Sequence, residues 1–178
     1  MTPHTFVINV QHLPPVAKRG QHVLVLLEDG NHDFVLGQKD IYPPNICRMV
    51  GGGVENGETS LKAASREVLE ELGIGIPEEK FKHIGQVIFR ISDRDENVYL
   101  FTTNIYWARL SEEGLIPSSD LNGIVRLEPA QMEALVERYA LLPKKIDPLL
   151  KFSWFDYGQI YGPIHQIALQ AVYKKRWI

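Results

Sequence analysis

Residues 51–74 of the chain read GGGVENGETSLKAASREVLEELGI, a glycine-rich loop followed by a segment with helical periodicity. Apolar residues recur every three or four positions from Thr59 to Leu72, which predicts an amphipathic helix. Thr59 suits the N-cap, and Gly73 suits the position just after the helix, where the left-handed conformation is common. One face of this helix is expected to carry Leu61, Ala64, Ser65, Val68 and Leu72.

Three carboxylates lie close together on the predicted helix. Glu67, Glu70 and Glu71 stand at positions i, i+3 and i+4, which predicts that they share the face opposite the apolar stripe. Like charges at this spacing destabilise an isolated helix by about 0.2–0.5 kcal/mol per pair, and Arg66 is the only cation beside them. Carboxylate oxygens suit Mg²⁺ or Mn²⁺. A solvated acidic face is the alternative, and on the helix alone it is the commoner case.

The loop before the helix favours the metal site. Glycines at 51–53 and 57 let the backbone adopt positive φ and approach a ligand or metal closely. Three consecutive glycines exceed what a simple strand-to-helix turn requires. A P-loop would need lysine where Glu58 stands, and the dinucleotide fingerprint would need glycine where Asn56 stands. Both of these phosphate-binding motifs therefore fit poorly.

The segment resembles the Nudix box, G-x5-E-x7-R-E-U-x-E-E-x-G-U, in which U is a bulky aliphatic residue. Every specified position is filled, by Gly52, Glu58, Arg66, Glu67, Val68, Glu70, Glu71, Gly73 and Ile74. The resemblance implies an α/β fold, a Nudix-like α/β/α sandwich in which helices flank a mixed sheet. It also implies a Mg²⁺-dependent (or Mn²⁺-dependent) pyrophosphohydrolase that cuts a diphosphate bond in a nucleoside diphosphate linked to another moiety.

Individual roles follow from the same resemblance. The expected metal ligands are the side chains of Glu67, Glu70 and Glu71 and the backbone carbonyl of Gly51. The expected catalytic residues are Glu58, Arg66, Glu67, Glu70 and Asp120. Arg66 would orient the glutamates, and Glu58 would brace the loop against the helix. The residues expected at the substrate are Gly52, Gly53 and Arg90.

The general base has two candidates. Nudix proteins use a glutamate of the box in some cases and an acid on a later loop in others. Asp120 is the preferred candidate, because it precedes a short predicted strand where relatives often carry an acid, and Glu67 is the alternative. Glu112 and Glu113 stand in the same loop.

The rest of the chain predicts one α/β domain over residues 1–178, with a C-terminal helical extension from about residue 143. Apolar runs bounded by turn residues predict strands at 5–10, 22–27, 34–37, 46–50, 81–91, 98–110 and 124–127. Helices are predicted after Pro129 and from about Pro163 to Lys175. The aromatic residues Phe152, Trp154, Phe155, Tyr157 and Tyr161 are predicted to fill the core rather than to stack on a base.

Composition narrows the class of protein. The net charge of −3 argues against nucleic-acid binding, but a small nucleotide-like anion can still bind where a metal supplies positive charge. Cys47 is the only cysteine, so an intrachain disulfide is excluded, and it is predicted to be a small buried hydrophobe. No secretory signal or membrane span is visible. A cytoplasmic enzyme is expected, and a homodimer is compatible with the sequence.

Two alternatives stay open. The first is a non-catalytic Nudix module that senses or binds a nucleotide, and the second is an enzyme like isopentenyl diphosphate isomerase. The intact box favours hydrolysis over the first, and Cys47 does not stand in a motif that matches the second. The sequence lacks the downstream markers of ADP-ribose and dinucleoside polyphosphate hydrolases near Phe89 and Arg90. It therefore does not name the substrate.

Overall fold

The computed structural model describes residues 2–110, 114–119 and 121–176. Its strands are β1 (His4–Asn9), β2 (Gln21–Glu28), β3 (Phe34–Gln38), β4 (Lys82–Ser92), β5 (Val98–Arg109) and β6 (Gly123–Leu127). Its α-helices are α1 (Ser60–Leu72), α2 (Pro129–Ala140) and α3 (Trp154–Arg176), and its short 3-10 helices are η1 (Pro15–Arg19) and η2 (Glu78–Lys80). None of the helices in these ranges is both long and apolar enough to cross a membrane.

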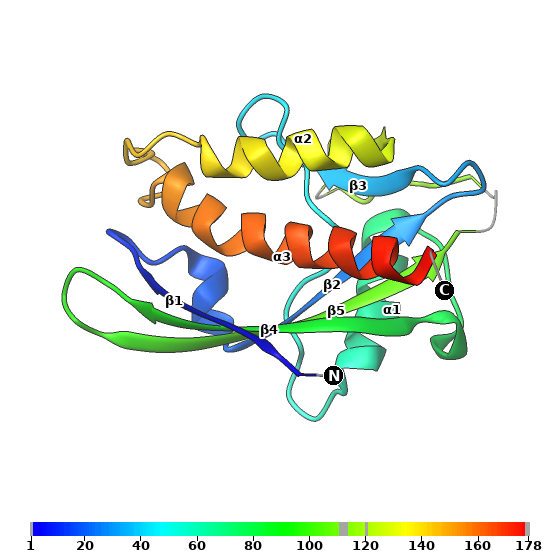
Figure 1. Ribbon diagram of the computed structural model, residues 1–178, viewed down its shortest axis with the longest axis horizontal. Coiled ribbons are helices and arrows are strands. Elements are labelled where there is room, and N and C mark those ends of the chain that lie inside the picture. Colours follow the sequence, from blue (N-terminus) through cyan, green and yellow to red (C-terminus); the bar gives the residue numbers. More distant parts are fainter. Residues whose placement is uncertain (1, 111–113, 120, 177–178) are drawn as a thin grey trace.

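The strands form one mixed sheet of six strands in the order β1-β4-β5-β2-β3-β6. The β1–β4 and β2–β5 pairs are parallel, whereas β4–β5, β2–β3 and β3–β6 are antiparallel. Helix α1 lies on one face of the sheet, and α2 and α3 lie on the other (Figure 1). The expected α/β/α sandwich with a mixed sheet is confirmed.

Strand β2 explains how one sheet supports two cores. Val23, Val25 and Leu27 pack with α1, whereas Leu24 and Leu26 pack with α2 and α3. All five of these side chains are fully buried. A strand covered on both faces reads as a continuous apolar run, because neither face needs polar side chains.

The segment 46–50 is not a strand, contrary to the sequence prediction. Arg48 exchanges backbone hydrogen bonds with Gly37 on β3, and the Val25 amide on β2 donates to Val50. The segment thus pairs with β3 at Arg48 and with β2 at Val50, so it makes isolated bridges instead of a continuous ladder. This crossing carries the chain from β3 to the glycine loop beside β2.

Helix α3 begins at Trp154, nine residues before the predicted start at Pro163. The Ser153 hydroxyl accepts a hydrogen bond from the Asp156 amide at 3.0 Å, which is the contact expected of an N-cap. Pro163 lies inside the helix, although proline is most common in the first helical turn. Four of the five aromatic residues predicted to fill the core are buried in it, Phe152, Trp154, Tyr157 and Tyr161. Phe155 is only partly buried and does not belong to this cluster.

Candidate functional site

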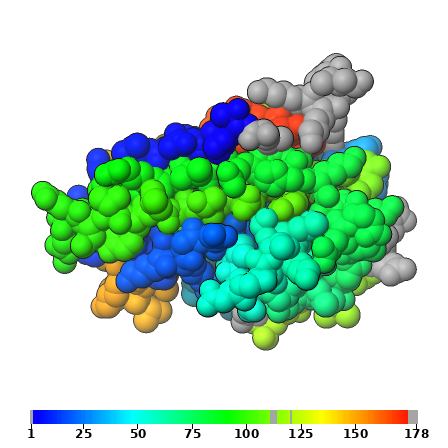
Figure 2. Space-filling model, turned by 90° about the horizontal axis from the view of Figure 1, so that it is seen from below, coloured from blue at the N-terminus to red at the C-terminus, as the bar shows by residue number. Residues whose placement is uncertain are grey.

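A polar pocket opens where the glycine loop meets α1. Its walls come from η1, β2, the segment after β3, the loop and α1. Viewed from below, η1 in blue lies beside the loop and the start of α1 in cyan (Figure 2). The lining residues are Pro15, Val16, Arg19, His22, Lys39, Arg48, Gly51, Gly52, Glu67, Glu70 and Glu71.

Helix α1 is fixed at both ends as the sequence predicts. The Thr59 hydroxyl accepts a hydrogen bond from the Lys62 amide at 3.2 Å. Gly73 adopts φ 70°, and its amide donates to the Leu69 carbonyl. Val68 and Leu72 are buried against the sheet. These contacts set the rotation of the helix and hence the direction of its glutamates.

At two positions of the loop, neighbouring atoms lie so close to the backbone that only glycine fits without moving them. Gly51 has φ 143°, and a Cβ atom there would lie 2.2 Å from the Val23 carbonyl oxygen. A Cβ atom on Gly52 would lie 2.3 Å from Oε1 of Glu67. The loop therefore runs against β2 on one side, and the Glu67 carboxylate packs directly on its backbone on the other.

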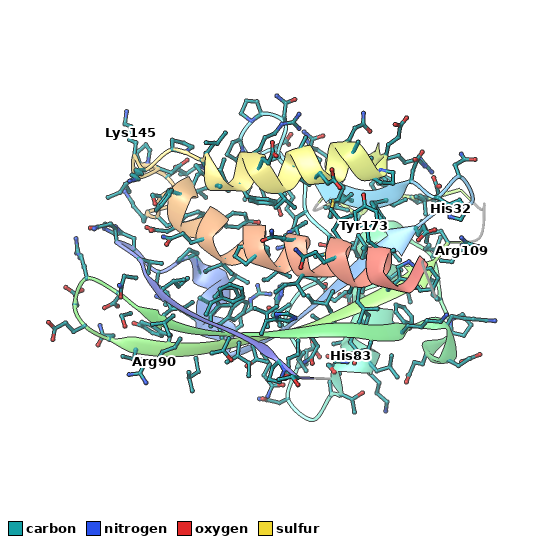
Figure 3. All side chains as sticks on the ribbon, viewed as in Figure 1. His32, His83, Arg90, Arg109, Lys145 and Tyr173 are labelled. Carbon is teal, nitrogen blue, oxygen red and sulfur yellow. The ribbon has the colours of Figure 1, made fainter. Side chains whose placement is uncertain are left out.

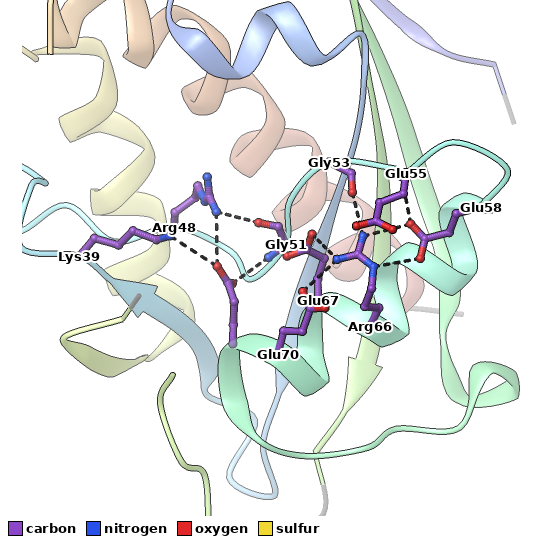
Figure 4. Close-up of polar contacts among 10 residues, drawn as sticks. Lys39, Arg48, Gly51, Gly53, Glu55, Glu58, Arg66, Glu67 and Glu70 are labelled. Carbon is purple, nitrogen blue, oxygen red and sulfur yellow. Dashed lines mark hydrogen bonds and ion pairs between the residues drawn. The ribbon is translucent and has the colours of Figure 1, made fainter. Parts of the chain in front are cut away.

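Arg66 joins the loop to the glutamates (Figure 4). Its Nε and Nη2 atoms donate to the two carboxylate oxygens of Glu58, each at 3.0 Å, and Nη2 also donates to the Gly53 carbonyl at 2.9 Å. Nη1 donates to Glu67 and Glu70, each at 2.9 Å. All five guanidinium N–H donors are thereby used. The hydrogen bond from Arg66 is the main reason that the pKa of Glu58 lies below its usual value.

Glu71 is held by a different set of groups. Its side chain is largely buried, and Oε2 accepts a hydrogen bond from the Gly51 amide at 3.1 Å. Oε1 lies 3.7 Å from Nζ of Lys39 and 3.8 Å from Nη2 of Arg48. Arg48 also donates to the Gly51 carbonyl at 2.7 Å. The fold therefore adds two cations, Lys39 and Arg48, to Arg66 beside the glutamates.

The three glutamate side chains differ in their exposure to solvent. The side chain of Glu70 is 57% exposed, whereas those of Glu67 and Glu71 are 12% and 10% exposed. The difference arises because the glycine loop and the segment containing Arg48 pack over the latter two. Burial raises the pKa of Glu67 against the effect of Arg66, and the charges of Glu71 and Glu70 raise it further.

The donors suit a divalent cation in kind. Three carboxylates of α1 and the loop backbone at Gly51 line the same pocket, and oxygen donors of this type fit Mg²⁺ or Mn²⁺. Within the described part of the chain, no three His, Cys, Asp or Glu side chains converge closely enough to hold a metal. Arg66 forms ion pairs with Glu67 and Glu70, whereas Lys39 and Arg48 lie beside Glu71. A bound cation would take over the neutralisation that these side chains provide.

The other residues singled out in the sequence are not found among the residues that line the pocket. Arg90 is exposed on β4, is not among the residues lining the pocket, and points away from the body of the molecule (Figure 3). Asp120, Glu112 and Glu113 lie outside the described residues. Cys47 is buried, and burial raises the pKa of its thiol to about 11, so it is the inert hydrophobe that was predicted.

The sequence did not single out Lys39, Arg48 or His22 as site residues. All three line the pocket, and none belongs to the box. One signal was present for Arg48, since a charged residue interrupts the apolar run at 46–50 just before the glycines. Lys39 and His22 carry no such local signal, because only the fold brings their segments together.

Comparison with known proteins places the chain in a family. The family model described as NUDIX domain matches residues 18–150, and a search of curated proteins gave no match. Among solved structures, an Escherichia coli dihydroneopterin triphosphate pyrophosphohydrolase is 26% identical, with 64% of this chain and 84% of that chain covered and a TM-score of 0.51. A mutator MutT protein from Bacillus halodurans is 21% identical, with 65% and 72% covered and a TM-score of 0.54.

A MutT/nudix family protein from Enterococcus faecalis is 27% identical, with 65% of this chain covered and a TM-score of 0.49. The present chain spans 46% of the length of that protein. The family model covers the whole of the box and every residue that lines the pocket except Pro15 and Val16. The chain belongs to the Nudix hydrolase family.

Proposed function

We propose that the protein is a Mg²⁺- or Mn²⁺-dependent pyrophosphohydrolase. Its substrate would be a nucleoside diphosphate linked to another moiety, either a nucleoside triphosphate or a nucleoside diphosphate sugar of the ADP-ribose type. The observation that carries the proposal is the pocket that unites the box glutamates with the Gly51 and Gly52 backbone. By its name, the Escherichia coli neighbour is a pyrophosphohydrolase of a triphosphate, which supports the same reaction class.

Residues that line the pocket and residues that support them have different roles. Glu67, Glu70, Glu71 and the Gly51 carbonyl would hold the cation, which when bound supplies charge neutralisation and acidifies a water molecule. Arg66 fixes the directions of Glu67 and Glu70 through its Nη1 atom. The Glu58 carboxylate anchors Arg66 in turn, so that loop and helix move as a unit.

Proton removal from the attacking water needs a carboxylate in the pocket. Glu67 is one candidate, because its carboxylate lines the pocket against the backbone of Gly52 and a carboxylate beside the attacking water can take its proton. Asp120 stays the other candidate for this role. A Glu67→Gln variant and an Asp120→Asn variant separate the two, because only loss of the true base removes the acidic limb of the pH–rate profile.

A cysteine-dependent isomerase does not fit the pocket. Cys47 is buried and does not line the pocket, and a reactive cysteine needs a lowered thiol pKa, whereas here the pKa is raised to about 11. We therefore favour hydrolysis over isomerisation of a diphosphate ester.

The experiment that tests the proposal is a screen for released phosphate or pyrophosphate with Mg²⁺, Mn²⁺ or EDTA. The substrates are dNTPs, NTPs, ADP-ribose, sugar nucleotides and dinucleoside polyphosphates, with Glu71→Gln as the inactive control. Metal-dependent cleavage of one class by the native chain alone supports the proposal and selects the substrate. If none is cleaved although metal and nucleotide bind, the chain is a nucleotide-binding module.

Two further expectations from the sequence stay predictions. Light scattering on the purified chain tests the homodimer, and fractionation of cells that make the protein tests the cytoplasmic location.

A further inference from the structure

Three cationic side chains line the pocket together with the glutamates of α1. Arg19 ends η1, Lys39 follows β3, and Arg48 lies in the segment that crosses from β3 to the loop. These three side chains come from separate parts of the chain, yet all line the pocket. Lys39 and Arg48 lie within ion-pair distance of Glu71, whereas Arg19 has no carboxylate within that distance among the described residues. The charge of Arg19 is therefore left for a ligand.

His22 on β2 gives an independent indication of a ligand. The residue is 1% exposed and lines the pocket, and among the described residues neither ring nitrogen has a hydrogen-bond partner. A buried polar group without a partner is costly. Burial, Arg48 and Arg19 lower the pKa of the His22 imidazole, so the ring is neutral at physiological pH and offers one donor and one acceptor.

Arg48 makes the contacts that a cation would displace. Its guanidinium donates to the Gly51 carbonyl at 2.7 Å and lies 3.8 Å from Glu71, and both groups are proposed metal ligands. The same guanidinium lies 5.4 Å from the centre of the Tyr161 ring, and it donates to the Tyr161 hydroxyl at 3.2 Å. A cation at Gly51 and Glu71 would release the guanidinium N–H groups that face the pocket. A planar fork of donors suits phosphate oxygens.

We propose that the pocket contains a phosphate-binding wall for the substrate phosphate that the water molecule does not attack. The wall consists of Arg48, Lys39, Arg19 and His22. When the cation binds, the guanidinium of Arg48 turns from Gly51 and Glu71 to this phosphate. The inference rests on the proposed function and deepens it. These four side chains would bind the phosphate chain of the substrate, so a diphosphate without a nucleoside should also bind to them.

The first test separates Arg48 as a phosphate ligand from Arg48 as a structural residue. The probe is imidodiphosphate, a diphosphate with a non-hydrolysable N–H bridge, titrated calorimetrically onto the full chain at constant free Mn²⁺. Arg48→Gln should raise the Kd for imidodiphosphate at least about tenfold, as expected for a lost charge-assisted contact. The same variant should bind Mn²⁺ alone as tightly as the native chain or more tightly, because a competitor for Gly51 and Glu71 is gone.

Matched variants keep this test decisive. Lys39→Gln, at a more exposed position, should weaken imidodiphosphate binding without loss of thermal stability. Arg126→Gln removes an equal charge from an exposed pair with Asp29 and should change neither affinity. Unchanged imidodiphosphate binding in both Arg48→Gln and Lys39→Gln would overturn the proposal. So would a joint loss of Mn²⁺ binding, imidodiphosphate binding and melting temperature in Arg48→Gln.

His22→Leu tests the remaining member of the wall. A leucine removes the unpartnered nitrogens, so the melting temperature should be unchanged or higher while imidodiphosphate binds more weakly. Unchanged binding would overturn the assignment of His22 and point to a buried water shared with Thr103, whose hydroxyl has no hydrogen-bond partner in the described part of the chain either. All of these readouts are independent of turnover. They can therefore succeed even where the substrate screen fails, which separates this inference from the proposed hydrolysis.

Discussion

The side chain of Glu71 accepts a hydrogen bond from the backbone amide of Gly51 at 3.1 Å, across 20 positions of sequence. The contact ties the last turn of α1 to the first residue of the glycine loop. The other carboxylate oxygen lies near Lys39 and Arg48. One carboxylate oxygen of Glu71 thus holds the loop, and the other faces the cationic side chains of the pocket.

Replacing Glu71 with glutamine separates these two roles. The amide oxygen can still accept the hydrogen bond from Gly51, but the negative charge that attracts a cation is lost. We expect kcat/KM to fall by about 100-fold or more and Mn²⁺ affinity to fall with it, while the melting temperature changes little. Glu137→Gln, on the exposed side of α2, is the matched control. Near-native turnover in Glu71→Gln would show that Glu71 does not bind the metal.

Gly52→Ala tests whether the loop backbone positions Glu67. The new Cβ atom would lie 2.3 Å from Oε1 of Glu67, and the end of that side chain can move away more easily than the backbone. We expect Mn²⁺ affinity and kcat to fall by about tenfold or more, with a small change in melting temperature. Gly75→Ala is the control, because its added Cβ has no heavy atom within 4 Å from the described residues beyond its two chain neighbours. Native-like kinetics in Gly52→Ala would mean that the position of Glu67 is not critical.

The parts of the site that the sequence predicted are local ones. The caps of α1 at Thr59 and Gly73 and the contact between Arg66 and its glutamates all arise within the box, where spacing fixes geometry. Arg48 and His22 could not be placed, because they reach the pocket only when the chain crosses between β3 and β2. The sheet was predictable from its apolar runs, but a run that changes partner, as at 46–50, looks the same in sequence as a strand.

The start of α3 was missed for a related reason. Pro163 marks a common helix start, but a proline can lie inside a helix when packing compensates for the missing N–H group. Ser153 and the buried aromatic residues provide that packing and the cap. Tertiary contacts with α2 therefore override the local signal.

Gly158→Ala tests how closely α3 approaches α2. A Cβ atom there would lie 2.2 Å from the backbone carbonyl oxygen of Tyr139, so one helix would have to move. We expect a loss of about 1–3 kcal/mol in the free energy of unfolding, measured by urea denaturation. Gly162→Ala meets the Tyr139 side chain at 3.2 Å and should cost less. Equal effects of the two variants would contradict the close approach at Gly158.

His165 should make stability depend on pH. Its ring is fully buried, Nε2 accepts from the Met49 amide at 3.1 Å, and Nδ1 lies 2.7 Å from the Tyr161 carbonyl oxygen. An accepting Nε2 requires a neutral ring, and burial, the largest cause, lowers the pKa of His165 to about 4. Above about pH 6.5, the usual histidine value, neither the folded nor the unfolded state binds a proton here, so this group leaves stability at its maximum.

Between about pH 6.5 and 4 the unfolded chain takes up a proton at His165 that the folded chain refuses. The free energy of unfolding should then fall by about 1.4 kcal/mol per pH unit from this group, and His22 acts in the same direction because its pKa is also lowered. His165→Gln can keep both hydrogen bonds without titrating, so urea denaturation of the metal-free chain from pH 7 to 5 should show a slope smaller by about one proton. If the slope of the unfolding free energy against pH does not change, the folded chain protonates His165 as readily as the unfolded chain. The assignment of a neutral ring that links α3 to Met49 would then be wrong.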